Sequence, residues 1–475
     1  PGWNGPLYYL LLRGWVALVG TSEYGMRFFS LLFGVLCVPL VYVVGHRLFN
    51  ASTGILAGLL AATSPYLAWY SQEAKMYTLV LALALVAVYS LRRALAGGGW
   101  AWWATQIAAT SLAFYAHILA ALLVPVQILL ALVWWPETRM RWRGALVSLA
   151  FLTLPYLPLA VWQAPLALRA RETGFYPYAL TQMIAILLDG WSTGVGEWGG
   201  PLATALMSLL AAGGLLSAVA PLSPPADADE EQLAEEPAAY CAVMLIWLSL
   251  PLLCVWLISL RQPLFTDRYL IWSAPAFYLL VALALRSFAA ARGPGRWIAA
   301  VLLGIILIVN LVNLWKQATV PIKSDFRAAA RYVADYEQAA EKNQHPRSDS
   351  GSHHSVYLPI AGAAASGFDD LIIFQIPHAK YTFDYYFPVE TYTHADGLFT
   401  NHRAPDGSYL MSEQRVAHEM RMLSSGYDAA WLVASEVRMW DERELVQGWL
   451  EEQALRVAEG HFHRVDVYRY DLPDS

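Results

Sequence analysis

Long apolar segments, separated by short polar stretches, fill the first two thirds of the chain. A hydrocarbon core about 30 Å thick requires ~20 apolar residues in a helix that crosses it. By this measure the pattern predicts ten membrane-spanning helices, and between the fourth and fifth of them His117 alone marks the turn. The ten segments are residues 27–45, 54–70, 76–95, 100–118, 119–135, 144–162, 201–220, 239–260, 269–287 and 297–315.

Residues 6–19 are also apolar, but they are too few for a span and Arg13 interrupts them. This pattern favours an amphipathic helix that lies at the membrane interface. The chain opens at Pro1 without an initiator methionine or a signal peptide. We therefore expect that the natural N-terminus lies upstream of Pro1.

Residues 317–475 change character and alternate between short strand-like and helix-like segments. Such alternation predicts a small α/β domain with Rossmann-like layering. No GxGxxG or GxxxxGK[ST] motif occurs in it, so we assign it no nucleotide. Residues 337–354 are polar, and we expect a flexible insertion there. The expected helices are Asp325–Tyr336 and Glu442–Ala458, and the expected strands are Ser355–Ile360, Leu371–Ile376, Trp431–Ala434 and Arg464–Tyr470.

The composition agrees with a membrane protein, since 57% of the residues are apolar and only 14% are charged. Soluble domains carry roughly 25% charged residues. No basic stripe accompanies the net charge of −6, which argues against a nucleic-acid partner. Cys37, Cys241 and Cys254 lie inside apolar runs, which is typical of small core residues rather than of disulfides or metal ligands. The acidic segment 221–238 is expected to be a disordered linker or a docking tail.

The basic residues of the short loops predict the orientation in the membrane. One set of loops contains nine arginines, at positions 47, 92, 93, 139, 141, 143, 286, 292 and 296. The other set, with the span end at Arg27, contains six Lys or Arg residues, at positions 27, 75, 169, 171, 261 and 268. This bias places the first set in the cytoplasm. Because ten spans return the chain to its starting side, residues 1–20 and 317–475 are expected to share the outer face.

The octapeptide Tyr70–Tyr77 (YSQEAKMY) lies between the apolar runs 55–69 and 78–91. Placing a charged side chain in hydrocarbon costs at least ~3 kcal/mol, so this cluster belongs at a membrane surface or in a water-filled cavity. One interpretation is a hydrated turn in which Lys75 extends toward the lipid headgroups. The other is the rim of an active site.

At this point the motifs resemble a known family. The string Gly5–Leu10 (GPLYYL) is followed by Glu23–Arg27 (EYGMR), Gly45–Phe49 (GHRLF), Ser64-Pro65 and the octapeptide. Later matches are Tyr115-Ala116-His117, Arg268-Tyr269-Leu270 and Asp325–Ala330 (DFRAAA). In this order, along the whole chain, they resemble the bacterial dolichyl-phosphate-mannose-protein mannosyltransferase-like proteins of glycosyltransferase family 39, which are related to the aminoarabinose transferases of lipid A.

The resemblance implies a polytopic α-helical membrane protein of GT-C type, with a transmembrane domain over residues 1–316 and an extracytoplasmic α/β domain over residues 317–475. It also implies transfer of a sugar from a polyprenyl-phosphate donor to a protein, lipid or glycan acceptor at the outer face of the inner (plasma) membrane. Two departures stand out. The family's catalytic Asp lies in a first outer loop, a region that precedes Pro1, and Asn4-Gly5-Pro6 stands where the family usually has His-Pro-Pro.

The chemistry of such a transfer indicates which residues to examine. Breaking the glycosidic bond builds negative charge on the donor phosphate, and nearby cations stabilise it. The expected phosphate-binding residues, each at the outer end of a span, are Arg27, Lys75 and Arg268. Each could instead anchor the protein to lipid phosphates. The acceptor hydroxyl needs a carboxylate, for which Glu73 is the candidate, although it could simply pair with Lys75. Residues expected to line the site are Tyr8, Tyr9, Tyr70, Tyr77, His117 and Tyr269.

Other acids and histidines are weaker candidates. Glu137 is expected on the cytoplasmic side, and Glu172, Asp189 and Glu197 fall in an expected outer loop, residues 163–200. His117 could also be an ordinary core histidine. The histidines of residues 345–402 lack the paired spacing of metal ligands, so no cofactor is expected, with a divalent metal left open.

Three functions compete. The first is the glycosyltransferase, and the second is a catalytically silent homologue that serves as a subunit of a membrane complex. The third is a lipid or solute transporter, a class that often shows paired inverted halves with broken helices at mid-membrane. No internal repeat is visible, and the ionisable residues lie at span ends.

Overall fold

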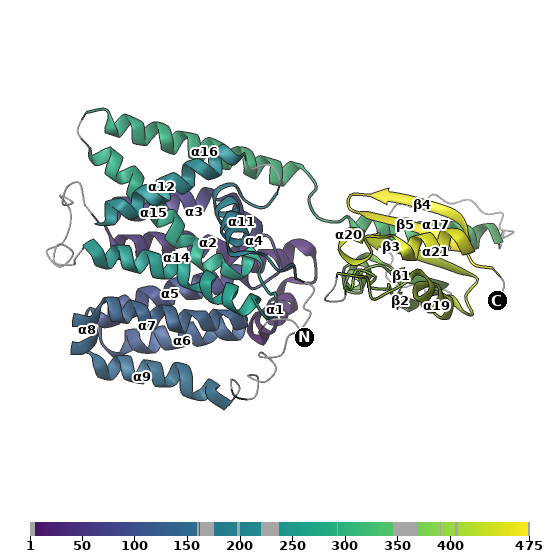
Figure 1. The fold of residues 1–475 in the computed structure, drawn as a ribbon, viewed down its shortest axis with the longest axis horizontal. Helices are drawn as coiled ribbons and strands as arrows, with labels where there is room; N and C mark the ends of the chain where they lie inside the picture. Colours follow the sequence, from purple (N-terminus) through teal and green to yellow (C-terminus); the bar gives the residue numbers. More distant parts are fainter. Residues whose placement is uncertain are drawn as a thin grey trace. The chain divides into compact units, whose positions relative to one another are not determined.

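The computed structural model describes residues 5–158, 161, 175–196, 200–219, 237–291, 293–344, 368–389, 391–403 and 407–473. The chain forms two compact units, Pro1–Thr319 and Val320–Ser475. The first unit is a bundle of helices, and the second is built around a β-sheet (Figure 1).

The first helices of the bundle follow the predicted spans closely. α2 and α5 are long enough to cross a membrane. The predicted span 54–70 is two helices that meet at an angle of 58°. Ser64 causes the break, because it is extended and its side chain caps α4 at the Leu67 amide, and Pro65 opens α4. The elements are α1 (Pro6–Val19), α2 (Glu23–Leu48), α3 (Ala51–Thr63), α4 (Pro65–Ser71) and α5 (Tyr77–Leu95).

The next helices form antiparallel pairs, and His117 lies in the first turn, as predicted. A buried hydrogen bond joins Gln106 on α6 to Gln127 on α7 across this turn. The predicted span 144–162 is a shorter helix, α9, followed by η2, and residues 159, 160 and 162 lie outside the described residues. The elements are α6 (Trp100–Ala116), η1 (Ile118–Leu122), α7 (Leu123–Val133), α8 (Trp135–Met140), α9 (Trp142–Thr153) and η2 (Leu154–Tyr156).

The prediction of a loop over residues 163–200 is wrong for residues 180–193, which form the helix α11. Its apolar side chains Met183, Leu187 and Trp191 are buried, whereas Thr181 is exposed. The segment is amphipathic and too short to resemble a span, so the hydropathy pattern did not reveal it. The remaining elements are α12 (Pro201–Val219), α14 (Pro237–Ser259), η3 (Asp267–Ser273), α15 (Ala274–Ala290) and α16 (Gly295–Thr319).

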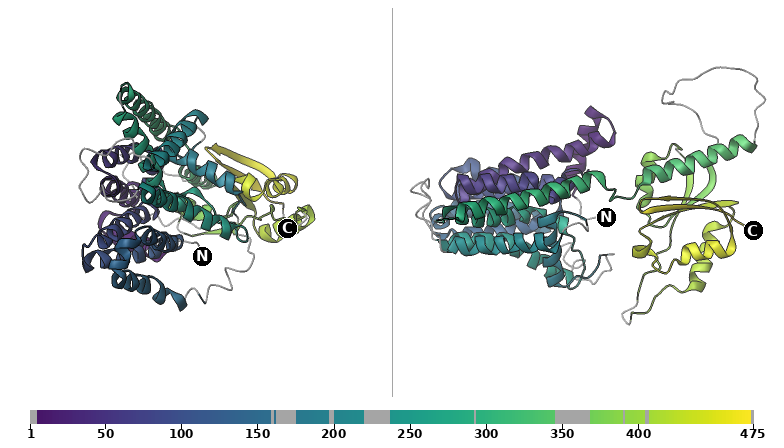
Figure 2. Two further views of the ribbon diagram at one scale, coloured as in Figure 1. Left: turned by 60° about the vertical axis from the view of Figure 1, so that its left-hand side comes forward. Right: turned by 90° about the horizontal axis from the view of Figure 1, so that it is seen from above.

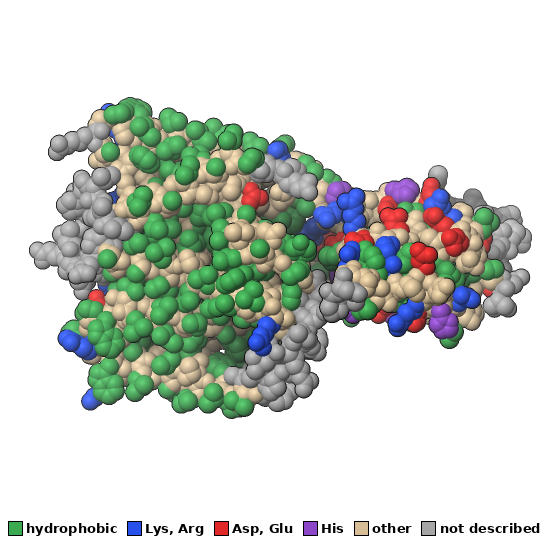
Figure 3. All heavy atoms as spheres, in the orientation of Figure 1, with side chains coloured by type: hydrophobic (Ala, Val, Ile, Leu, Met, Phe, Trp, Pro, Cys, Tyr) green, Lys and Arg blue, Asp and Glu red, His purple; other side chains and the backbone are tan. Residues whose placement is uncertain are grey.

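Five helices in the described part of the chain are long and apolar enough to cross a membrane, or six if α3 and α4 form one span. α5 and α15 are buried on nearly all sides. By contrast, α16 exposes Val301, Ile308 and Leu311. Apolar side chains cover the visible face of the bundle, whereas charged side chains of both signs cover the C-terminal unit (Figure 3). The unit is therefore a polytopic membrane bundle, and the number of ten spans stays a prediction.

The two ends of the bundle differ. α1, α4 and α11 gather at one end, which we call the α4 end, and α8 lies at the other, the α8 end (Figures 1 and 2). Near the end of α16, Gln317 Nε2 donates to the Val195 carbonyl just beyond α11. α16 therefore finishes at the α4 end, together with the turn between α4 and α5.

The C-terminal unit has three layers, as its alternating pattern predicts. The strand order is β2-β1-β3-β5-β4, with β2, β1 and β3 parallel and the last two pairings antiparallel. α17 and α18 cover one face of this sheet, and α19 and α21 cover the other. The strands are β1 (Phe368–Phe374), β2 (Tyr392–Asp396), β3 (Ala429–Ser435), β4 (Leu455–Phe462) and β5 (Val465–Asp471). The helices are α17 (Phe326–Gln344), α18 (Ala379–Tyr386), α19 (Glu413–Ser424), α20 (Val437–Trp440) and α21 (Leu445–Gln453).

The sequence-based boundaries need three corrections in this unit. α17 runs on to Gln344, into the segment that we expected to be flexible from residue 337. The predicted helix Glu442–Ala458 is only α21, and its last residues belong to β4, which pairs with β5. β2, α18 and α19 were not predicted. The expected strand Ser355–Ile360 lies outside the described residues.

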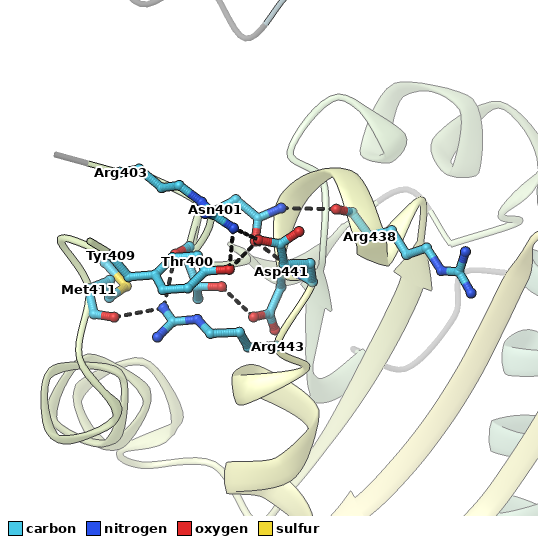
Figure 4. A network of polar contacts seen from close by, with 9 residues as sticks. Thr400, Asn401, Arg403, Tyr409, Met411, Arg438, Asp441 and Arg443 are labelled. Atoms are coloured by element: carbon cyan, nitrogen blue, oxygen red, sulfur yellow. Dashed lines mark hydrogen bonds and ion pairs between the residues drawn. The ribbon is translucent and has the colours of Figure 1, made fainter. Parts of the chain in front are cut away.

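A network of polar side chains fixes the start of α21 (Figure 4). The Asp441 carboxylate accepts hydrogen bonds from the Leu445 and Val446 amides at 3.1 and 3.0 Å. It also accepts one from the Thr400 hydroxyl. Arg443 donates to the carbonyls of Thr400 and Met411. The two bonds from the Leu445 and Val446 amides to Asp441 satisfy free amides of the helix start, and the helix begins three residues later than predicted.

Candidate functional site

The octapeptide forms a tight turn between α4 and α5 at the α4 end of the bundle. Within it the Lys75 amide donates to the Glu73 carbonyl at 2.7 Å. Ser30 on α2 fixes the turn, because its hydroxyl donates to the Lys75 carbonyl at 3.0 Å and also bonds the Tyr8 hydroxyl on α1. The Glu73 side chain is half-buried and that of Lys75 is exposed. Ser30 therefore ties the turn to α2 and, through Tyr8, to α1, while the charged side chains of the turn remain at least partly exposed.

Asp267, at the start of η3, lies next to this turn. Its carboxylate accepts a hydrogen bond from the Tyr70 hydroxyl at 2.7 Å and one from Thr266 at 3.2 Å. The Tyr66 hydroxyl donates to the Asp267 carbonyl at 3.0 Å. Two tyrosines of α4 thus hold the start of η3, although nearly 200 residues separate the two segments.

Arg268 follows Asp267 and lies among aromatic rings. Its guanidinium carbon is 5.9 Å from the centre of the Tyr77 ring and 6.0 Å from that of Tyr269, which is the range of cation–π attraction. Glu73 interacts electrostatically with this guanidinium. The buried Nε atom of Arg268 has no hydrogen-bond partner among the described residues. A buried donor without a partner is costly, so this N–H group is available to a hydrogen-bond acceptor from outside the described residues.

His117 packs against the same rings. Its ring lies 4.7 Å from the Tyr269 ring and 6.5 Å from the Tyr77 ring, between centres. Its buried Nε2 atom lacks a hydrogen-bond partner within the part of the chain that the structure describes. His117 therefore contacts the same aromatic rings as Arg268.

Gly5 brings the start of α1 close to His117. Its amide donates to the Ala116 carbonyl at 3.0 Å. A Cβ atom at Gly5 would lie 1.9 Å from the Tyr115 carbonyl oxygen, so only glycine permits this approach. This contact gives a structural reason for the departure from His-Pro-Pro at that position.

The structure brings together most of the residues that the sequence singled out. Tyr70, Tyr77, Tyr269, His117, Glu73 and Arg268 form one connected group. Ser30 links the Lys75 carbonyl to the Tyr8 hydroxyl, and the exposed Tyr9 packs edge-on against Tyr8. Arg27 is exposed on α2, and it is not among the described residues that contact this group.

Two further acids that the structure describes are not bonded to this group. Asp189 on α11 accepts hydrogen bonds from Thr204 at 2.7 Å and from Thr193, so it ties α11 to α12. Glu137 is on α8, at the opposite end of the bundle. Glu172 and Glu197 lie outside the described residues. Among the residues that the structure describes, no group of three or more His, Cys, Asp or Glu side chains could hold a metal ion.

Sequence reasoning missed Asp267 and Tyr66 as members of the site. The only signal for Asp267 was its place directly before Arg268 at the start of a late span. Tyr66 gave no signal, because its role depends on a contact with a segment about 200 residues away. Both belong to the framework that positions Arg268.

A family model for dolichyl-phosphate-mannose-protein mannosyltransferase matches residues 4–162. This match covers α1 to α9, including the octapeptide and His117, but neither α11 nor η3. No curated protein matches the chain.

Solved structures match nearly the full chain at low identity. ArnT from Cupriavidus metallidurans in the apo state is 12% identical, with a TM-score of 0.56 over 98% of this chain and 87% of that one. The structure of the same ArnT bound to undecaprenyl phosphate is 13% identical, with a TM-score of 0.54 over 98% of this chain and 88% of that one. The oligosaccharyltransferase of Archaeoglobus fulgidus, in complex with Zn and sulfate, is 13% identical, with a TM-score of 0.55 over 99% of this chain and 65% of that one.

The family model and the shared fold together support a GT-C glycosyltransferase-like membrane protein.

Proposed function

We propose that this GT-C-like protein transfers a sugar from a polyprenyl-phosphate donor to an acceptor at the outer face of the inner (plasma) membrane. The observation that carries the proposal is the setting of Arg268. This partly buried cation lies near the Tyr77 and Tyr269 rings, and its Nε atom has no hydrogen-bond partner among the described residues. It lies at the end of a lipid-facing bundle, where the phosphate of a membrane-embedded donor would be. The structure of ArnT with undecaprenyl phosphate supports a polyprenyl phosphate as the carrier.

Arg268 and Lys75 would bind the donor phosphate in this mechanism. As the glycosidic bond breaks, the phosphate gains negative charge, and fixed cations lower the energy of that transition state. The guanidinium can donate two parallel hydrogen bonds to phosphate oxygens, while the exposed Lys75 contributes a mobile point charge. The rings of Tyr77 and Tyr269 hold the guanidinium in place between them.

Glu73 would orient the acceptor hydroxyl and take up its proton. Its carboxylate is half-buried in the turn, within electrostatic reach of Arg268. Asp267 is less suited to this step, because Tyr70 and Thr266 already bond both of its carboxylate oxygens. We assign Asp267 a positioning role, in which it keeps η3 and Arg268 against α4.

Donor binding tests this proposal directly. We expect purified wild-type protein to bind undecaprenyl phosphate saturably, and Arg268→Ala to weaken that binding at least tenfold. Isothermal titration or native mass spectrometry would measure the affinity. Arg261→Ala is the matched control, because Arg261 is exposed in the segment between α14 and η3. Equal affinity in all three proteins would contradict the proposal.

Turnover separates an enzyme from a catalytically silent homologue. A labelled polyprenyl-phospho-sugar is incubated with the protein and with membranes from cells that lack it. Transfer of label to membrane or protein acceptors supports the enzyme. Donor binding without transfer would instead support a non-catalytic subunit of a membrane complex.

The outer-face location predicts a labelling pattern. In a chain whose native cysteines are replaced by alanine, Ser425→Cys should react with an impermeant thiol reagent in intact cells or spheroplasts. Met140→Cys on α8 should react only after lysis. Both positions are exposed. The reverse pattern would contradict an outer-face reaction. The replaced residues are Cys37, Cys241 and Cys254.

A further inference from the structure

Two adjoining hollows lie at the α8 end of the bundle, away from the candidate site. The first, about 430 Å³, lies between the turn that precedes α6 and the start of α9. The second, about 420 Å³, runs between α6, α7 and α9. Trp103 and Trp142 line both hollows, so the two adjoin at these rings, and together we call them the groove.

The lining of the first hollow is positively charged. Arg141 and Arg143 line it, and none of its described lining residues is acidic. The Arg141 guanidinium lies against Gly97, whose φ is +96°, and a Cβ atom there would be 2.6 Å from its Nη2 atom. The glycine thus makes room for the guanidinium beside the start of α6. No side chain of the described residues caps that helix, whose N-terminal amides add positive potential.

The second hollow is an apolar crevice. Alkyl side chains on its walls include Leu91, Ile128 and Leu149. Arg139 lines its edge, and three of the other polar groups on its walls bond one another: Ser148 donates to Gln106, which donates to Gln127. Gln127 in turn donates to Thr110. These groups need no water or ligand, so the crevice offers its occupant mainly hydrocarbon contacts.

We infer that an anionic glycerophospholipid binds in this groove, with its phosphate at Arg141 and Arg143 and one acyl chain in the crevice. The order of charge and hydrocarbon along the groove matches the order along such a lipid. Trp100, Trp135 and Trp142 are exposed around it, as tryptophans of the membrane interface are. The bias of the loop arginines predicts that this end faces the cytoplasmic leaflet, where anionic lipids attract basic residues.

This site is separate from the donor site. Leu91 lies in the second hollow and Tyr77 in the donor site, at opposite ends of α5. Their 14-residue separation corresponds to about 21 Å along a helix. The inference therefore does not depend on the proposed glycosyl transfer.

Lipid binding to the purified full-length protein tests the inference. Native mass spectrometry would compare phosphatidylglycerol with phosphatidylcholine of the same acyl chains. We expect wild-type protein to retain the anionic lipid preferentially. Arg141→Gln with Arg143→Gln should weaken that retention about 30-fold, because each arginine near the phosphate contributes roughly a factor of five. Arg286→Gln with Arg296→Gln is the matched control, with the same charge change at residues outside both hollows.

A second variant tests the crevice. Ala145 lines it, and Ala145→Trp should reduce retention of the lipid while leaving the arginines in place. Should this variant fail to fold, lysophosphatidylglycerol and inorganic phosphate replace it as probes of wild-type protein. The lysolipid should compete with phosphatidylglycerol, and phosphate alone should not. Equal retention of both headgroups, an equal loss in the control, displacement by free phosphate, or displacement by undecaprenyl phosphate would each overturn the inference.

Discussion

Arg268→Ala should reduce sugar transfer by about 100- to 1000-fold while the protein still inserts and folds. Removing one fixed donor from a charge-stabilising site costs rates of this size. The loss should be large here because the Tyr77 and Tyr269 rings hold the guanidinium in place and its Nε atom has no other partner among the described residues. Arg268→Lys should recover only part of the rate, since it keeps the charge but loses the planar fork.

The measurement is transfer of labelled sugar by equal amounts of purified protein. Arg261→Ala removes the same charge from an exposed position in the segment just before η3 and should retain the wild-type rate. Lys75→Ala should also lose activity, but less, because Lys75 is exposed. If Arg268→Ala and Lys75→Ala both transfer sugar at the wild-type rate, these residues only anchor the protein to lipid phosphates.

The sequence predicted the α4–α5 turn well because its signal is local. A few charged residues between two apolar runs can lie only at the end of a bundle, and the structure places Glu73 and Lys75 there. The partners of that turn were not predictable in the same way. Tyr70 bonds Asp267 across about 200 residues, and hydropathy carries no information about which turns meet.

Elements whose pattern depends on packing were also missed. α11 buries one face only and is too short to resemble a span, so it was expected to be a loop. In the C-terminal unit, residues 455–462 were assigned in part to a helix, but pairing with β5 makes them a strand. Tertiary hydrogen bonding outweighs a weak local preference in such segments. The boundaries of α2 and α5, by contrast, follow directly from long apolar runs.

Glu73→Gln should lose most transfer activity with little change in thermal stability. Glutamine keeps the shape of the side chain and some hydrogen bonding, so the change removes mainly the charge. Losing one charged interaction in a partly dry site costs roughly 2–4 kcal/mol of barrier, or about 30- to 1000-fold in rate. Glu137→Gln on α8 is the matched control, because it removes the same charge at the opposite end of the bundle.

A double variant shows how Glu73 acts. If Glu73 holds Lys75 against the phosphate, Glu73→Gln and Lys75→Met should cost together little more than either alone, because residues that act as one unit are not additive. If Glu73 orients the acceptor independently, the two losses should multiply. Asp267→Asn tests a third role: loss of this positioning residue should weaken donor binding through Arg268. Glu73→Gln should leave donor binding intact if Glu73 only orients the acceptor, and should weaken it if Glu73 holds Lys75. Full activity in Glu73→Gln would make the turn a hydrated link between helices and require another group to take the acceptor proton, with Asp267 the first to test.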